Sequence, residues 1–308
     1  MIINTKEGLH MWRFVQIIGF FAVYLTPLHK LTSLSEMTFG ERLKAVLERL
    51  GVVFVKLGQF LATRNFFQKE TQVELRKLWD SRTPLPFEVI RPIIEQELGG
   101  RISECFESFD PNPIASASVA QVYRAMYKGE ESVVKVLRPG AIDEIQRDMR
   151  LVRFLVRTSG FVSSTIKYVH SLGAIDTVEE WLRQETNFHN EAHGAEMFRS
   201  CYQDIDSIVI PDVYFSSRTV LVEEFLREGI PVNKWSEEYR EQGYDPQASM
   251  RNLFAHTFGW VFKRIVVPIH GDPHPANILI MKDGRIGFID FGLVGEISER
   301  ELKSFTEA

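Results

Sequence analysis

The sequence has few cysteines, little excess charge and no long hydrophobic run. Cys105 and Cys201 are the only cysteines in 308 residues, and they form neither a metal-ligand spacing nor a disulfide framework, which fits a reducing compartment. The net charge of −5 provides no basic footprint for nucleic acid. Hydrophobic residues at 44% and charged residues at 25% are ordinary values for a globular protein of one large domain or two lobes.

Residues 9–28 are rich in aromatic and aliphatic side chains. Their uninterrupted apolar stretch, residues 17–25, is shorter than the about 20 residues that span a bilayer, and no signal-peptide cleavage site follows it. Two interpretations stay open: a core helix, or a helix on a membrane surface. The second would place these side chains at the interface or near the headgroups: Trp12, Tyr24, Arg13, His29 and Lys30.

The rest of the first hundred residues has helical spacing. Thr38 and Glu41 have capping-box spacing before an apolar helical pattern that Gly51 could split. Pro86 suits the first turn of a further helix, which is expected to stop at residues 99–100.

The pattern changes after residue 105. Strands are expected near 118–127 and 132–137, joined through residues 128–130, and further strands near 208–214, 219–226 and on both sides of a turn at 282–284. Helices are expected at 141–158, 177–200 and near 247–264. This order predicts an α+β fold.

The most specific motif lies near the end of the chain. Asp272 precedes Asn277 by five residues, and Asp290-Phe-Gly292 begins thirteen residues after Asn277. Phosphoryl transfer requires a carboxylate that orients or deprotonates the acceptor and oxygen ligands that hold Mg²⁺ on the phosphates. Asp272 suits the first role, while Asn277 and Asp290 suit the second. The expected hairpin between these two residues would bring them to one edge of a cleft.

His270 and His274 flank Asp272. No third histidine or cysteine stands at ligand spacing, so hydrogen bonds to the backbone are a better interpretation than a zinc site.

Lys135 lies within the apolar strand pattern Val133-Val-Lys-Val136. A buried ammonium requires an anionic partner, and in kinases the partners are nucleotide phosphates and a helix glutamate. Residues 180–198 supply Glu185 and Glu191, which would lie about 240° apart on one continuous helix. One of them could therefore meet Lys135 while the other faces elsewhere.

No G-x-G-x-x-G precedes Lys135. A run of small residues occupies the position of the phosphate-covering loop, and its alanines lack the positive-φ freedom of glycine, so a stiffer loop is expected. The expected nucleotide-covering residues are Ile114, Ala115, Ser116, Ala117, Ser118, Val119, Ala120, Gln121 and Val122.

Lys56 and Gln59 share one face of a helix in an apolar stretch. By itself this spacing favours the solvated edge of an amphipathic helix.

Taken together, these motifs resemble the UbiB family of atypical kinases, which is linked to ubiquinone biosynthesis. The resemblance covers about residues 40–298 and depends on these segments: Lys56-Leu-Gly-Gln59, the alanine-rich run 115–122, Val133-Val-Lys135, His270-Gly-Asp-Pro-His-Pro-Ala-Asn277 and Ile289-Asp-Phe-Gly292.

The resemblance implies a two-lobed, protein-kinase-like fold with a helical KxGQ extension over the active site. It implies that Lys56 enters the cleft and pairs with Glu185, leaving Glu191 for Lys135. ATP and Mg²⁺ are the implied cofactors. Glu223 and Phe225 would lie in the adenine hinge, and Asp272 would be the acceptor base.

Two departures from the family pattern affect these expectations. The aspartate of the family's ExD motif is Asn187 here, and only 16 residues follow Gly292, which predicts a truncated C-lobe or a degenerate member. The expected divisions are an N-terminal helix (1–35), the KxGQ extension (36–105), an N-lobe (106–228) and a partial C-lobe (229–308).

The function implied by the resemblance is that of an ATP-dependent kinase or ATPase at the cytoplasmic side of a bacterial inner membrane. Its partners would be the membrane surface, ubiquinone-pathway enzymes and quinone-precursor lipids, with no nucleic acid. A catalytically impaired, nucleotide-responsive scaffold is the alternative. The alanine-rich loop and the long separation of Lys135 from Glu191 disfavour an ordinary protein or aminoglycoside kinase.

Overall fold

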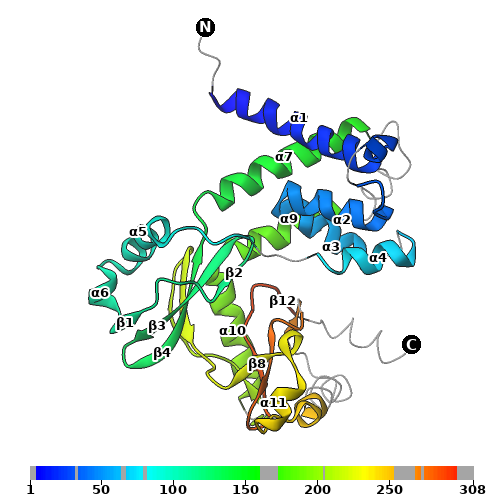
Figure 1. Ribbon diagram of the computed structural model, residues 1–308. Helices are drawn as coiled ribbons and strands as arrows, with labels where there is room; N and C mark the ends of the chain where they lie inside the picture. Colours follow the sequence, from blue (N-terminus) through cyan, green and yellow to red (C-terminus); the bar gives the residue numbers. More distant parts are fainter. Residues whose placement is uncertain are drawn as a thin grey trace. The chain divides into compact units, whose positions relative to one another are not determined.

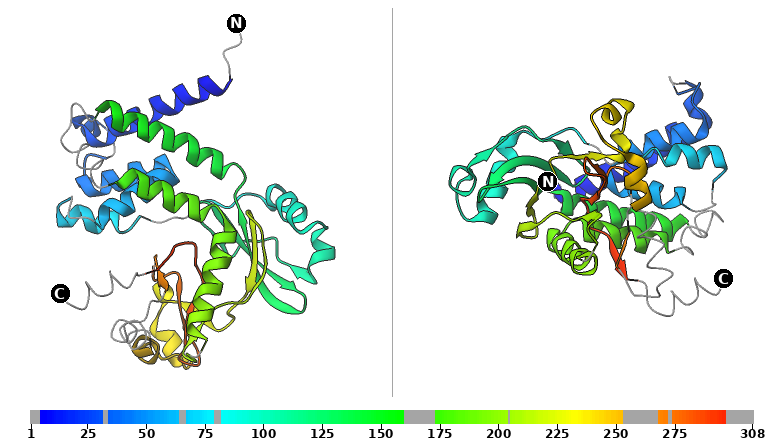
Figure 2. Two further views of the ribbon diagram at one scale, coloured as in Figure 1. Left: turned by 180° about the vertical axis from the view of Figure 1, so that it is seen from behind. Right: turned by 90° about the horizontal axis from the view of Figure 1, so that it is seen from below.

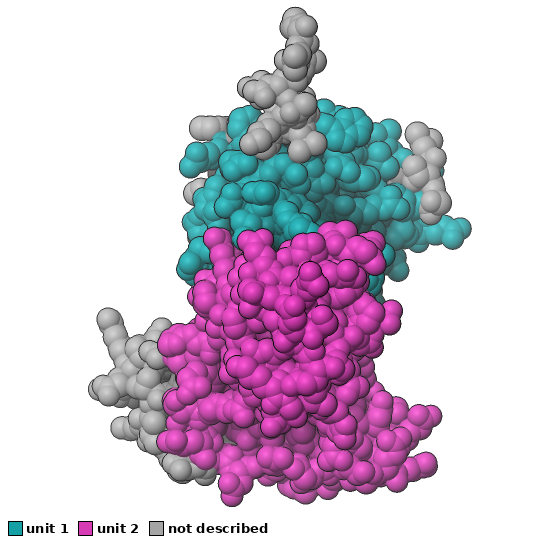
Figure 3. Space-filling view, turned by 90° about the vertical axis from the view of Figure 1, so that its left-hand side faces the viewer, with its two compact units in different colours: residues 1–84, 116–120, 138–183 teal, residues 85–115, 121–137, 184–308 magenta. Residues whose placement is uncertain are grey.

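The computed structural model describes residues 5–31, 34–63, 67–78, 82–159, 173–203, 205–252, 268–271 and 274–296. Its mixture of helices and strands confirms the α+β class (Figure 1). Contacts divide the chain into two compact units (Figure 3). Unit 1 comprises residues 1–84, 116–120 and 138–183, and unit 2 comprises residues 85–115, 121–137 and 184–308. Most of the helix expected near 247–264 lies outside the described residues.

Unit 1 is helical, and the helix boundaries expected at Thr38 and Gly51 are confirmed. The Oγ1 of Thr38 accepts a hydrogen bond from the Glu41 amide, and the Glu41 carboxylate accepts one from the Thr38 amide, so the capping box forms. Gly51, at φ 97°, separates two helices. The elements of this unit are α1 (Thr5–Leu25), η1 (Pro27–Leu31), α2 (Phe39–Leu50), α3 (Val52–Ala62), α4 (Lys69–Leu75), α7 (Ala141–Ser159) and most of α9 (Ala174–Glu185).

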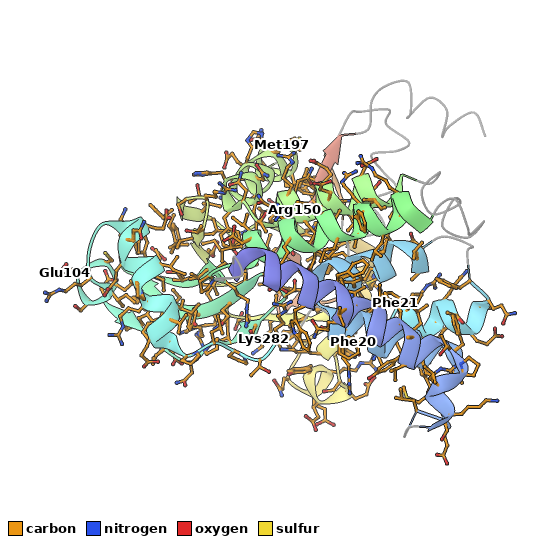
Figure 4. All side chains as sticks on the ribbon, turned by 90° about the horizontal axis from the view of Figure 1, so that it is seen from above. Phe20, Phe21, Glu104, Arg150, Met197 and Lys282 are labelled. Carbon is orange, nitrogen blue, oxygen red and sulfur yellow. The ribbon has the colours of Figure 1, made fainter. Side chains whose placement is uncertain are left out.

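Helix α1 packs along α7 within unit 1 (Figure 1). The Arg13 guanidinium lies 2.6 Å from the carboxylate of Asp148 on α7, whose side chain is only 1% exposed. Ile17 and Tyr24 are buried, and Phe21, labelled in Figure 4, contacts Phe54 of α3. The membrane interpretation is therefore wrong for Arg13 and Tyr24, because Arg13 neutralises a buried carboxylate and the Tyr24 ring is covered.

The opposite face of α1 remains apolar and exposed. Trp12, Val15 and Ile18 are 68%, 52% and 45% exposed, respectively. Among the helices that the structure describes, none combines the length and hydropathy needed to cross a bilayer.

A six-stranded sheet forms the centre of unit 2. Its strands follow the order β1-β3-β4-β7-β6, with β2 paired to β3. Lys128 and Gly129 have φ values of 53° and 83°, so the β3–β4 hairpin turns on two left-handed residues, within the expected link. The strands are β1 (Ser108–Phe109), β2 (Ala115–Ser116), β3 (Ala120–Tyr127), β4 (Glu130–Leu137), β6 (Val213–Ser216) and β7 (Val220–Glu224).

Helices cover both faces of this sheet (Figures 1 and 2). Helix α5 (Phe87–Leu98), followed by α6 (Ile102–Cys105), packs its buried Ile90 and Ile94 against alternate valines of β4 and β7. Helix α5 follows Pro86 and ends at Gly99, whose φ is 73°, as expected. Helix α10 (Phe188–Tyr202) contacts β6 and β7 from the other side.

The remaining strands carry the C-terminal motifs. A four-stranded sheet has the order β5-β11-β10-β8, and a two-stranded sheet joins β9 to β12. The expected hairpin at residues 282–284 is confirmed as the β10–β11 connection. The elements are β5 (Ile208–Val209), β8 (Gly229–Pro231), η2 (Val232–Lys234), α11 (Glu237–Glu241), β9 (Pro268–His270), β10 (Ile278–Met281), β11 (Ile286–Phe288) and β12 (Val294–Glu296).

The continuous helix expected over 177–200 is wrong. Helix α9 ends at Glu185, and α10 begins at Phe188. Asn187 is the N-cap between them, with φ −146° and a side-chain oxygen that accepts a hydrogen bond from the His189 amide at 3.2 Å. The angle computed for Glu185 and Glu191 on one helix therefore does not apply.

Candidate nucleotide site

Lys135 lies at the centre of a buried ionic cluster in unit 2. Its Nζ atom lies 2.5 Å from Oε1 of Glu191 on α10 and 2.9 Å from Oε1 of Glu223 on β7. The same ammonium donates a hydrogen bond of 2.7 Å to the carbonyl oxygen of Ile289, the residue before Asp290. The structure thus brings together Lys135, Glu191 and the Asp290 segment, which lie far apart in the sequence.

The charges of this cluster determine its protonation. Burial by itself would lower the pKa of Lys135, but the negative charges of Glu191, Glu223 and Asp290 outweigh burial and raise that pKa. Burial raises the pKa of both glutamates, and the Lys135 charge opposes this change. Lys135 therefore stays an ammonium, the form that can bind a phosphate.

Asn277 and Asp290 flank the paired ends of β10 and β11. Ile278 pairs with Phe288, and the Ile289 amide donates to the Asn277 carbonyl oxygen at 3.1 Å. An amide and a carboxylate thus stand at adjoining ends of two paired strands, and oxygen donors of this kind suit Mg²⁺. Asp272, the expected acceptor base, lies outside the described residues.

A glycine of α10 lets this helix approach the Asp290-Phe-Gly292 segment closely. A Cβ atom on Gly194 would lie 2.6 Å from the Phe291 carbonyl oxygen, so any side chain there would push the two segments apart. Phe291 is 1% exposed and packs on Phe198, one turn beyond Gly194. Sequence reasoning missed Gly194, although a glycine inside a helix pattern is itself a signal of close packing.

The two histidines near Asp272 have structural surroundings. The His270 ring packs among aromatic rings, with its centroid 5.5 Å from that of Phe288 and 5.8 Å from that of Phe291. The Nδ1 of His274 accepts a hydrogen bond from the Ala276 amide at 3.2 Å. No metal-binding group of three or more histidine, cysteine, aspartate or glutamate residues occurs in the described part of the chain.

Arg138, immediately after β4, anchors the middle of the alanine-rich run. Its guanidinium donates to the Ser116 hydroxyl at 2.9 Å and to the Thr83 carbonyl oxygen at 3.0 Å, and its amide donates to the Val119 carbonyl oxygen at 2.7 Å. The Ser118 hydroxyl is buried without a hydrogen-bond partner among the described residues. Arg138 gave no signal of its own in the sequence, because its contacts are with backbone and one hydroxyl far along the chain.

Both ends of the alanine-rich run belong to unit 2. The Ile114 amide donates to the Val122 carbonyl oxygen at 2.8 Å. Gln121 is fully buried, and its side chain bonds the Leu85 backbone and the Tyr123 hydroxyl. The Gln121 side chain therefore has a structural role.

Lys56 is 7% exposed, so its interpretation as the solvated edge of a helix is wrong. Gln59 donates to the Leu78 carbonyl oxygen at 3.2 Å. Lys56 belongs to unit 1 and Glu185 to unit 2, and their pairing stays a prediction.

The expected hinge segment, residues 223–225, overlaps the end of β7. The Phe225 amide donates to the Glu131 carbonyl oxygen at 2.9 Å, and the Arg124 guanidinium lies 4.2 Å from the centre of the Phe225 ring. The side chain of Glu223, by contrast, points to Lys135. Sequence reasoning missed that Glu223 is a second carboxylate partner of Lys135.

Comparisons with known proteins identify the family of this chain. An aarF domain-containing protein kinase of Arabidopsis thaliana, described as chloroplastic, is 35% identical over 266 residues, which are 84% of this chain and 48% of that protein. A probable protein kinase UbiB of Marinobacter nauticus is 34% identical over 282 residues, 89% of this chain and 51% of the relative. The chain spans about half the length of these two relatives.

A solved structure shares the fold. The complex of Rv3197 with erythromycin from Mycobacterium tuberculosis superposes with a TM-score of 0.52 at 28% identity, covering 81% of this chain and 63% of that one. The ABC1 atypical kinase-like domain model matches residues 77–308. The expected kinase-like fold is therefore confirmed, and the chain belongs to the ABC1 atypical kinase family, which includes the UbiB proteins.

Proposed function

We propose that this chain binds Mg–ATP and acts as an atypical kinase or ATPase. The observation that carries the proposal is the buried Lys135 ammonium, which contacts Glu191 at 2.5 Å and the backbone next to Asp290 at 2.7 Å. In a kinase site the lysine holds the α- and β-phosphates and the helix glutamate orients the lysine.

The other residues would complete the site. Asn277 and Asp290 would hold Mg²⁺, which bridges phosphate oxygens and neutralises charge that develops during transfer. Asp272 would orient or deprotonate the acceptor. The alanine-rich run would cover the phosphates.

Calorimetric titration with Mg–ATP tests the proposal. We expect Lys135→Ala to abolish measurable binding, since it removes the only group of this cluster that attracts phosphate. Lys128→Ala, which removes a lysine from the turn of the same hairpin, serves as the control and should bind like wild type. Unchanged affinity in Lys135→Ala would show that nucleotide does not use this lysine.

Turnover is the second part of the proposal. Wild-type chain should release phosphate from Mg–ATP, and Asp272→Asn should bind Mg–ATP without releasing phosphate. Binding without turnover in wild type would favour a nucleotide-responsive scaffold.

The relatives support a proposal about the cellular role. The likeness to a protein named UbiB supports a role in ubiquinone biosynthesis, with quinone-precursor lipids and pathway enzymes as partners. The exposed Trp12, Val15 and Ile18 support contact with a membrane surface. The likeness to a bacterial UbiB is the reason for proposing the cytoplasmic side of a bacterial inner membrane.

A further inference from the structure

Lys135 has one carboxylate more than a phosphate-binding lysine needs. Glu191 alone would hold the ammonium in position, yet Glu223 lies 2.9 Å from the same Nζ atom. Two carboxylates in direct contact with one ammonium leave this group of three with net negative charge when all are ionised. Such a group repels the phosphates that the lysine would bind.

The β4–β7 pairing holds Glu223 in this position. Val133 pairs with Glu223 and Lys135 pairs with Leu221, so alternation along both strands places the lysine and the glutamate on the same face of the sheet. The opposite face carries the valines that pack on α5. Strand alternation therefore keeps Glu223 on the face that carries Lys135.

The surroundings of Glu223 differ from those of a satisfied structural ion pair. The residue is 1% exposed, and its Oε2 atom has no hydrogen-bond partner among the described residues. Leaving a buried carboxylate oxygen unsatisfied is unfavourable, so the arrangement weakens the protein unless another group compensates or the carboxylate has a role in binding.

We infer that Glu223 competes with nucleotide phosphates for the Lys135 ammonium and thereby lowers the affinity of the site for Mg–ATP. The inference rests on the proposed nucleotide-binding function. When phosphates bind the Lys135 ammonium, the distance from this ammonium to the Glu223 carboxylate must lengthen or the charge of Glu223 must be neutralised. Glu191 keeps the lysine oriented during this change. Residue 223 therefore sets how tightly the phosphates are held.

Calorimetry of Glu223→Gln tests the inference, because glutamine keeps the size of the side chain and removes its charge. Removing one unit charge beside the phosphates should tighten Mg–ATP binding roughly tenfold. Adenosine carries no phosphate, so Glu223→Gln should bind adenosine with the same affinity as wild type. Glu223→Met also lacks the charge and suits a buried position. It should show the same gain in affinity for Mg–ATP, and it replaces the glutamine variant in the test if that variant does not fold.

Glu131→Gln is the matched control. It removes the same charge from β4, but the Glu131 carboxylate is ion-paired with Arg227 and lies outside the Lys135 cluster. The affinity of the Glu131→Gln variant for Mg–ATP should equal that of wild type.

The outcomes separate the two proposals. If wild type binds Mg–ATP and the position-223 variants bind equally or more weakly, the competition is refuted and the nucleotide site stands. An equal gain for adenosine would also refute it, since the effect would not act through phosphate. If neither wild type nor any variant binds, the proposed function and this inference both fail.

Discussion

Asn187 shows how one residue can replace the family's acidic group without loss of local structure. The family resemblance implies the aspartate of an ExD motif at this position, and this chain has Asn187. In the structure the Asn187 side chain caps α10, the helix that carries Glu191. Asparagine and aspartate are about equally good N-caps, so the substitution preserves the start of this helix.

Asn187→Ala should therefore destabilise the protein by about 1 kcal/mol, whereas Asn187→Asp should leave stability nearly unchanged. Urea unfolding followed by circular dichroism measures both. Equal midpoints for Asn187→Ala and wild type would show that the cap contributes nothing.

At the scale of elements, α1 has two different faces. One face is tied to unit 1 by the Arg13–Asp148 ion pair and by buried Ile17. The other presents Trp12, Val15 and Ile18 to solvent. A helix packed on one side and apolar on the other can rest on a bilayer without crossing it.

We expect the chain to co-sediment with mixed phosphatidylethanolamine and phosphatidylglycerol vesicles, and Trp12→Glu combined with Ile18→Glu to abolish this binding. Charges at these positions oppose insertion, while their exposure means that folding should be little affected. Val73→Glu, at a 46% exposed apolar position on α4, is the control and should bind vesicles like wild type. Vesicle binding that survives both α1 charges would exclude this face as the contact.

At the scale of the whole molecule, nucleotide and metal should stabilise the folded chain. A ligand that binds only the folded state raises the melting temperature by mass action. At about a hundred times the dissociation constant, Mg–ATP should raise it by roughly 4 °C.

Chelating Mg²⁺ should remove most of this shift. In Asp290→Asn, ATP should raise the melting temperature by the same amount with and without Mg²⁺. Asp283→Asn changes an exposed aspartate in the turn of the same hairpin and should behave as wild type. Differential scanning fluorimetry measures these shifts. A magnesium-dependent shift that persists in Asp290→Asn would mean that Asp290 is not a ligand.

Local chemistry allowed much of this fold to be predicted. Gly51, Pro86 and Gly99 mark helix ends because their backbone preferences act without distant partners. The motif around Asn277 and Asp290 predicted a hairpin, which the structure confirms. The break at Asn187 was missed because the apolar periodicity continues from α9 into α10, and periodicity alone does not reveal a cap.

The sequence by itself determined the class of protein, the positions of most helix ends and the residue types of the proposed nucleotide site. Tertiary structure alone decided which charges meet. Glu223 stands between Val222 and Glu224, and strand alternation does not say which of the two glutamates faces Lys135. Pairing with β4 decided that question, as packing of α7 decided the partner of Arg13, because a buried charge is stabilised only by groups that the fold brings to it.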